Sequence, residues 1–318
     1  MTADPQKSSR LLAYLQLVRL PNVFTAMADI FMGFWLTHDS LSPIGVFLLL
    51  LAASSCLYAA GMVLNDVFDV GQDRRERPHR PIPSGRVPLR NAKSLGWSLM
   101  FFGIAAGSGA SITVRQDLPT IMAMILAVSI LLYDRFAKLT PSGPGVMGFC
   151  RTCNVLLGAS ALRAPLTAGQ AGFQTSQLLM AIGIGVYIAG ITWFARREAA
   201  ISRRAQLTLG FIIAMAGIVL LWWFPRLPWS KVATMFDTQP LYWAALWLLV
   251  AALIGQRMVR AILRPEPALV QSAVKTSILS IILLDAIVVL AVRGLVPALV
   301  VLLLLIPAIL LGRRIYST

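Results

Sequence analysis

The strongest constraint on the fold of this chain is a series of long apolar segments that recurs along nearly its whole length. Ten such segments of 16–23 residues alternate with polar stretches, at about 20–37, 43–64, 93–114, 118–133, 145–164, 178–195, 206–224, 240–257, 269–291 and 295–312. Each can cross about 30 Å of hydrocarbon as a helix, and a helix satisfies its own backbone hydrogen bonds there. Charged residues make up only 13% of the 318 positions, whereas soluble domains carry about 25%. The sequence therefore predicts an all-α, polytopic membrane bundle with ten candidate transmembrane helices, and 1–318 as a single domain.

Basic residues gather at one end of this predicted bundle. The N-terminus and the loops after every second segment, above all 65–92 and 196–205, hold most of the 28 Lys and Arg. By the positive-inside rule, the N-terminus and these loops face the cytoplasm. The net charge of +15 is then mostly a consequence of topology. Cations dispersed over loops are not typical of a nucleic-acid-binding domain, so we expect membrane lipids and no nucleic acid as partners.

An acidic stretch, NDVFDVGQD, follows the second predicted helix directly. Asn65, Asp66, Asp69 and Asp73 fall within an arc of about 100° if the helix continues through them. Three carboxylates this close repel one another unless they share a cation. Hard divalent ions such as Mg²⁺ prefer oxygen ligands and leave positions for waters and substrate phosphates. The stretch therefore predicts a Mg²⁺ site at the membrane surface.

The next residues, RRERPHRPIPSGR, supply the complementary charge. Guanidinium groups bind phosphate oxygens in a bidentate manner, so arginines beside metal-holding carboxylates favour a diphosphate site above an apolar cavity. The alternative is a solvated, salt-bridged loop that obeys the positive-inside rule. That alternative explains the arginines but not the aspartates on one helix face.

These stretches together resemble a known family. NDxxDxxxD followed by RPxRPIPSG is similar to the first signature of the UbiA superfamily of intramembrane prenyltransferases. Arg19, Pro21 and Asn22 match the start of the family's first helix, and Tyr133 with Lys138 resembles its Tyr…Lys segment. The resemblance implies a helical bundle, usually of nine spans, around a central lipid-open cavity capped by the loops 65–92 and 196–205.

The resemblance also implies a reaction. A prenyl diphosphate is ionised with the help of Mg²⁺, and a lipophilic or aromatic acceptor attacks the allylic cation. Asp66, Asp69 and Asp73 are expected to hold the metal, with Lys138 as a further catalytic residue. The residues expected to contact the diphosphate are Asn22, Asn65, Arg77, Arg80, Arg151, Asn154, Arg196 and Arg197.

The family's second acidic signature is degenerate here. The corresponding positions in YIAGITWFARREAAISRR hold Ile191, Glu198 and Ser202, so Glu198 is the only carboxylate left as a metal ligand. Arg196 and Arg197 replace a second metal as a diphosphate clamp, or prenyl transfer is lost and only binding remains. CRTCNVLLG and YIAGITWFARREA resemble the UbiA-like EboC group of bacteria, which implies the bacterial inner membrane.

Ionisable residues also fall inside predicted spans, where they are costly and face the bundle interior. Asp29, Arg151 and Asp285 are examples. Arg151 either reaches the diphosphate or forms an ion pair with an aspartate, and that pair would hold two helices together. For Asp285 a structural role is favoured. Cys150 and Cys153 form CRTC, for which packing is favoured over a redox or metal role.

Three functions fit this pattern. The favoured one is an enzyme that transfers a prenyl group to a lipophilic acceptor. The second is a non-catalytic, UbiA-like protein that binds, scaffolds or exports a lipophilic metabolite. A secondary transporter would be expected to show paired, broken helices at the membrane midplane, whereas here the polar groups cluster at one membrane face.

Overall fold

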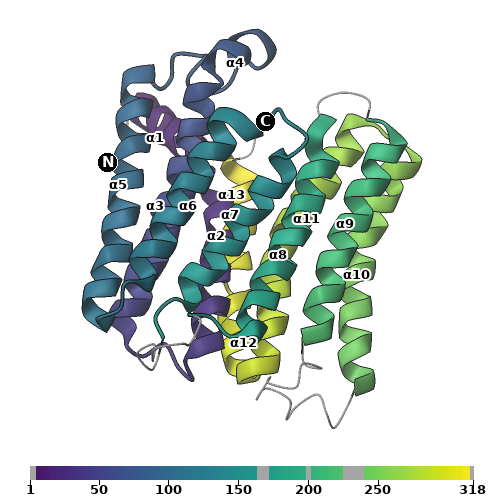
Figure 1. The fold of residues 1–318 in the computed structure, drawn as a ribbon. Helices are drawn as coiled ribbons and strands as arrows, with labels where there is room; N and C mark the ends of the chain where they lie inside the picture. Colours follow the sequence, from purple (N-terminus) through teal and green to yellow (C-terminus); the bar gives the residue numbers. More distant parts are fainter. Residues whose placement is uncertain (1–4, 163–171, 198–201, 225–239, 316–318) are drawn as a thin grey trace.

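The computed structural model describes residues 5–162, 172–197, 202–224 and 240–315. These residues form a bundle of helices that run side by side (Figure 1). The longer helices are α2 (Leu20–Thr37), α3 (Ile44–Phe68), α5 (Leu89–Val114), α6 (Leu118–Leu132), α7 (Gly143–Ala159), α8 (Thr175–Phe194), α9 (Arg204–Trp223), α10 (Pro240–Leu263) and α11 (Pro267–Arg293). The shorter ones are α1 (Pro5–Leu17), α4 (Val70–Glu76), the π-helical η1 (Tyr133–Ala137), the 3₁₀-helical η2 (Ala195–Arg197), α12 (Leu295–Leu302) and α13 (Leu305–Ile315).

Every one of the ten predicted segments is helical over most of its length, so the all-helical prediction is confirmed. Eight described helices are long and apolar enough to cross a membrane, or nine if α1 and α2, bent by 42°, form one span. The segment predicted at 145–164 corresponds to α7, which has 17 residues, at the lower limit of about 17–25 for a crossing. The last predicted span, 295–312, corresponds to Leu295–Ile315, which counts as one of the eight although a turn at Leu303 and Leu304 separates α12 from α13.

The helix α2 lies at the centre of the bundle. It packs against α3, α7, α11 and α13, and its buried residues include Ala26, Ala28, Ile30 and Phe34. Around it, α3 and α5 form one packed pair and α8 and α9 another. The N- and C-terminal parts of the chain therefore meet on α2.

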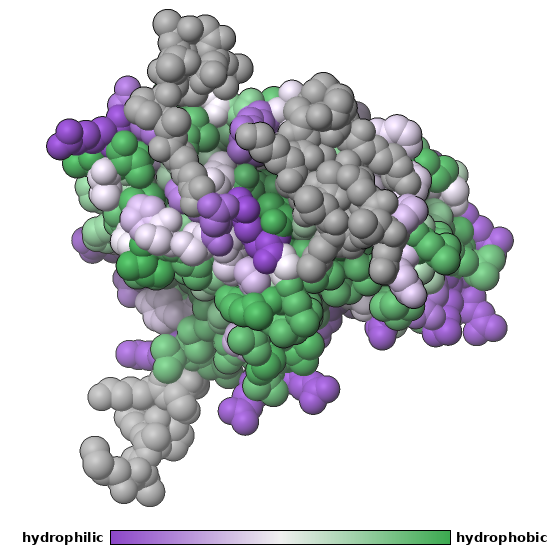
Figure 2. All heavy atoms as spheres, turned by 90° about the horizontal axis from the view of Figure 1, so that it is seen from below, coloured by the Kyte–Doolittle hydropathy of each residue, from purple (hydrophilic) through white to green (hydrophobic). Residues whose placement is uncertain are grey.

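Apolar side chains point outward from the peripheral helices. Phe101, Leu248 and Val296 on α5, α10 and α12 are 67%, 70% and 72% exposed. Seen from the end opposite α4, green apolar atoms cover much of the described surface, with hydrophilic atoms in smaller patches (Figure 2). A surface of this kind is unfavourable in water and suits contact with lipid chains. The chain is therefore an integral, multi-pass membrane protein.

Glycines allow α8 and α9 to approach closely. A Cβ added to Gly190 would lie 2.3 Å from the backbone nitrogen of Ala214, and one added to Gly217 would lie 2.5 Å from that of Tyr187. Helices associate in lipid mainly through such close backbone contact, since lipid tails are as apolar as the side chains.

The Gly190→Ala substitution is therefore expected to destabilise the protein by about 1–3 kcal/mol, because the two backbones must move apart. Unfolding of the purified protein in mild detergent measures this. Gly45→Ala is the matched control, since a Cβ there meets nothing within 4 Å. Equal unfolding free energies for the two variants would refute the close-contact explanation.

Candidate active site at the α4 end of the bundle

The acidic stretch does not continue as one straight helix. α3 ends at Phe68, Asp69 adopts φ −86° and ψ 1°, and α4 begins at Val70. The backbone hydrogen bonds nevertheless run on, from Asp69 N to Asn65 O at 2.9 Å and from Asp73 N to Asp69 O at 2.8 Å. The helix that was expected to continue through the four polar residues is thus interrupted at Asp69. Asp66 and Asp73 are buried, whereas Asp69 is partly exposed.

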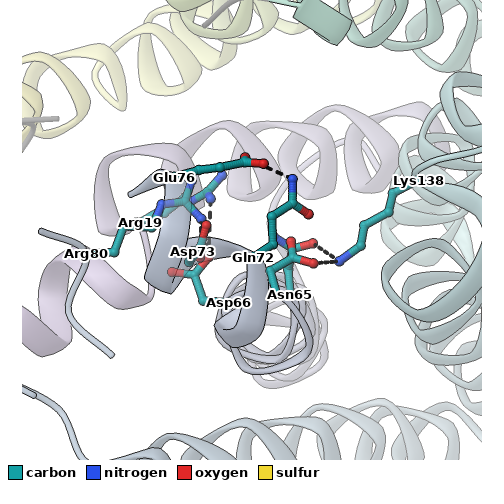
Figure 3. Close-up of polar contacts among 9 residues, drawn as sticks. Arg19, Asn65, Asp66, Gln72, Asp73, Glu76, Arg80 and Lys138 are labelled. Carbon is teal, nitrogen blue, oxygen red and sulfur yellow. Dashed lines mark hydrogen bonds and ion pairs between the residues drawn. The ribbon is translucent and has the colours of Figure 1, made fainter. Parts of the chain in front are cut away.

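One arginine holds the two buried carboxylates together. Arg80 Nη1 donates to Asp73 Oδ2 at 2.8 Å and to Asp66 Oδ1 at 3.3 Å. Arg19, between α1 and α2, places its Nη2 3.5 Å from the same Asp66 oxygen (Figure 3). Arg19 does so from a left-handed backbone conformation, φ 49° and ψ 49°, which costs a non-glycine residue roughly 1–2 kcal/mol. Backbone strain of this kind is concentrated at active sites and ligand-binding sites.

The segment after α4 folds back because it has its own small apolar cluster. Ile82 and Val87 are buried against Leu17, Val63 and Val67 from α1 and α3. Val87 N donates to Pro81 O at 2.9 Å, and the turn passes through Gly85 at φ 76°. The packing of this cluster places Arg80 at the end of α3, next to the carboxylates.

The other two residues of the acidic stretch, Asn65 and Asp69, contact a lysine. Lys138 Nζ donates to Asn65 Oδ1 at 3.3 Å and forms an ion pair with Asp69 (Figure 3). Lys138 follows η1, the π-helical turn that ends α6, and such turns are frequent at functional sites. Asn65 and Asp69 are one helical turn apart and share one edge of the arc, while Asp66 and Asp73 share the other. The division into two pairs therefore follows from helix geometry.

The donor set fits a magnesium ion only in part. Among the described residues, no three His, Cys, Asp or Glu side chains form a metal-sized group. Asp66 and Asp73 do converge on one point, where the Arg80 nitrogen lies. Mg²⁺ is usually held by one or two carboxylates, with substrate phosphates and waters completing its ligands. The pair Asp66 and Asp73 thus fits such an ion, while Asp69 is turned away toward Lys138.

Two of the residues expected to bind diphosphate lie deeper in the bundle. Arg151 Nη1 pairs with Asp29 Oδ2 at 2.8 Å, and Arg151 Nη2 donates to Thr25 Oγ1 at 2.7 Å. Asn154 Nδ2 donates to the same Asp29 oxygen at 2.8 Å. Of the two alternatives for Arg151, the structure contains the pairing that ties helices together. Asn22 lies in the first turn of α2, and Arg77 is half-buried at the end of α4.

The second polar segment contacts the residues that follow Lys138. Arg196 donates to the carbonyl oxygen of Thr140 and lies 4.8 Å over the Trp193 ring. Arg196 also borders a hollow of about 510 Å³ that is lined by Arg203 and Gln206. The side chain of Arg197 and all of Glu198 lie outside the described residues. Ile191, at the first position of the degenerate signature, is buried among apolar residues.

One acid near the site was missed by the sequence reasoning. Asp134, in η1, is only 3% exposed, and its Oδ2 has no hydrogen-bond partner within the described part of the chain. The signal for it was present, because Tyr133 and Lys138 were both recognised and Asp134 lies between them. The two CRTC thiols, by contrast, are buried in α7 as the packing interpretation predicts.

Comparison with known proteins decides the family. The sequence profile of the UbiA prenyltransferase family matches residues 26–279. The chain belongs to this family. Over 130 residues it is 33% identical to digeranylgeranylglyceryl phosphate synthase of Saccharolobus solfataricus, covering 41% of this chain and 44% of that protein. With the same-named protein of Sulfurisphaera tokodaii it shares 29% over 177 residues, 55% of this chain and 58% of the other. The matches thus span about half the length of these curated relatives.

Solved structures of UbiA proteins share the fold over nearly the whole chain. A digeranylgeranylglyceryl phosphate synthase superposes with a TM-score of 0.61 at 20% identity, over 90% of this chain and 99% of the other. A UbiA homologue from Archaeoglobus fulgidus, bound to GPP and Mg²⁺, gives 0.58 at 14% identity, over 89% and 100%. The UbiA-type helical bundle predicted by resemblance is confirmed. The EboC group remains a prediction, because these matches define the family and no subgroup within it.

Proposed function

We propose that this UbiA-family protein is a Mg²⁺-dependent prenyltransferase that moves a prenyl group from its diphosphate to a lipophilic acceptor. The observation that carries the proposal is the buried pair Asp66 and Asp73, which shares one guanidinium nitrogen of Arg80 at 3.3 and 2.8 Å. Two acids and an arginine fixed at the end of an apolar bundle are complementary to a metal-bound diphosphate. The A. fulgidus homologue with GPP and Mg²⁺ supports the same assignment.

The chemistry assigned to these residues is electrostatic. A bound Mg²⁺ would offset the negative charge that builds on the leaving diphosphate. Asp66 and Asp73 would hold that ion, and Arg80, released from them, would donate to phosphate oxygens. The carbon–oxygen bond breaks with its electron pair going to diphosphate. The acceptor's nucleophilic atom then attacks the allylic cation and loses its proton.

Lys138 and Arg196 are assigned to the opposite side of the same diphosphate. Lys138 contacts Asn65 and Asp69. Arg196 donates to the carbonyl oxygen of Thr140, which lies two residues after Lys138. Each of the loops 65–92 and 196–205 thus contacts the segment after η1, and we assign both loops to a cap over the cavity. Arg77, half-buried and without an ion pair among the described residues, is a further phosphate ligand in this proposal.

The α4 end is assigned to the cytoplasmic side of a bacterial inner membrane. Arg74, Arg75 and Arg90 lie at this end, and so do Arg313 and Arg314 at the end of α13. Such an excess of basic residues marks the cytoplasmic side. Prenyl diphosphates made in the cytoplasm would then reach the site directly.

A carrier or scaffold is the second candidate, because Ile191 and Ser202 stand where the family resemblance leads one to expect acids. The deciding experiment gives the purified protein in lipid nanodiscs Mg²⁺ and geranyl, farnesyl or geranylgeranyl diphosphate, with aromatic and glycerophosphate-type acceptors. We expect released diphosphate and a prenylated product, both abolished by EDTA. Binding of all three donors without any diphosphate release would reject the transferase and favour the carrier.

A further inference from the structure

A second charged cluster lies inside the bundle, separate from the proposed active site. It consists of Asp29 on α2, Arg151 and Asn154 on α7, and Asp285 on α11. Both aspartates are fully buried, and Arg151 is 7% exposed. Asp29 and Asn22 are seven residues apart on α2, which places the cluster about 10 Å along the helix from the first turn.

The hydrogen bonds of this cluster leave three carboxyl oxygens without a donor. Asp29 Oδ2 accepts from Arg151 and from Asn154, both at 2.8 Å. Asp29 Oδ1 and both oxygens of Asp285 have no partner in the described part of the structure. The side chains of Asp29 and Asp285 nevertheless lie within hydrogen-bonding reach of each other. Two groups that only accept hydrogen bonds when ionised therefore face each other.

The charges of the cluster do not balance either. The ionisable groups that face the two aspartates are Arg151 from α7 and, beneath its guanidinium, the Tyr58 ring from α3 at 5.3 Å. Two ionised aspartates beside one arginine would leave a net negative charge in an apolar interior, which is very costly. A metal cation would not resolve this imbalance, since Arg151 would repel it and the described residues supply only two carboxyl groups here.

We infer that Asp29 and Asp285 share one bound proton, carried by the Asp285 carboxylic acid and donated to Asp29 Oδ1. This proton supplies the missing donor and makes the cluster of Asp29, Arg151 and Asp285 neutral. It also joins α2 to α11, while Arg151 joins α2 to α7. Arg151 and Asn154 then belong to this cluster and not to the diphosphate site.

Infrared spectroscopy of the full chain in nanodiscs tests the inference. At neutral pH the wild-type protein is expected to show the carbonyl-stretching band of a protonated carboxylic acid, shifted in D₂O. Asp285→Asn is expected to lose one such band. Asp29→Asn is expected to lose the same band, because Asp285 then ionises beside Arg151. Asp117→Asn, an exposed acid between α5 and α6, is the control and should change nothing.

Thermal unfolding gives an independent readout. Asparagine at 285 keeps a donor for Asp29, so Asp285→Asn should unfold at the wild-type temperature, whereas Asp285→Leu should unfold earlier. If both aspartates were ionised, Asp285→Asn would instead raise the unfolding temperature, and the wild-type band would be missing. A stability that depends on sodium in the wild type but not in Asp285→Asn would likewise overturn the shared proton.

Discussion

The Asp66→Asn variant is expected to release diphosphate from prenyl diphosphates on the order of 10²–10³-fold more slowly than the wild-type protein. Asp66 is buried at the end of α3 and shares Arg80 with Asp73. The substitution keeps the shape of the side chain but removes the negative charge with which Asp66 would hold the Mg²⁺ ion beside the diphosphate. The initial rate of diphosphate release at saturating Mg²⁺ measures the effect.

A matched control separates this effect from a general loss of structure. Asp117→Asn makes the same chemical change at an exposed position at the start of α6, at the opposite end of that helix from η1, and should keep the wild-type rate. Both variants should unfold at temperatures close to that of the wild type. Full activity in Asp66→Asn would remove Asp66 from the catalytic site.

The Arg151→Leu variant is expected to lower the free energy of unfolding by about 3–5 kcal/mol. The substitution removes the cation that pairs with Asp29 and breaks a hydrogen bond to Thr25. A buried carboxylate without a counter-ion must then either stay charged in an apolar interior or take up a proton. Reversible unfolding in mixed detergent micelles measures the loss.

Two further variants make the cause specific. Arg90→Leu, at an exposed position at the start of α5, should change stability by no more than about 0.5 kcal/mol. Adding Asp29→Asn to Arg151→Leu should recover a large part of the loss, since the unpaired charge is then gone. A double variant as unstable as the sum of both single variants would show that the ion pair is not the cause.

The bundle itself could be predicted because lipid allows so few alternatives. A segment of membrane length must hydrogen-bond its own backbone, so apolar runs such as 206–224 and 269–291 had to be helices. The same reasoning could not predict the helix α1, because Pro5–Leu17 is short and polar and its helical structure depends on contacts with α2 and α3. The break at Leu303 and Leu304 also leaves no mark in a uniformly apolar stretch.

The acidic stretch shows where reasoning from one helix stops. The face shared by Asn65, Asp66, Asp69 and Asp73 was visible in the spacing, since helical periodicity is local. Their partners were not visible, because Arg80 depends on the packing of Ile82 and Val87, and Lys138 arrives from a different helix. Those contacts set which carboxylates share a cation.

The buried cluster marks the same limit more sharply. That Asp29, Arg151 and Asp285 face the interior followed from the cost of charge in lipid. Which of them pair depends on how α2, α7 and α11 pack, and Asp29 and Arg151 are 122 positions apart in the sequence. A single sequence holds no direct signal of such a contact.

The Mg²⁺ dependence of geranyl diphosphate binding bears most directly on the proposed site. In the wild-type protein, Mg²⁺ should tighten binding by at least about tenfold over the same buffer with EDTA. That gain should disappear in Asp66→Asn and in Asp73→Asn but persist in Asp117→Asn. Equal affinities with Mg²⁺ and with EDTA in the wild type, unchanged in Asp66→Asn, would contradict a metal-bound diphosphate at these carboxylates.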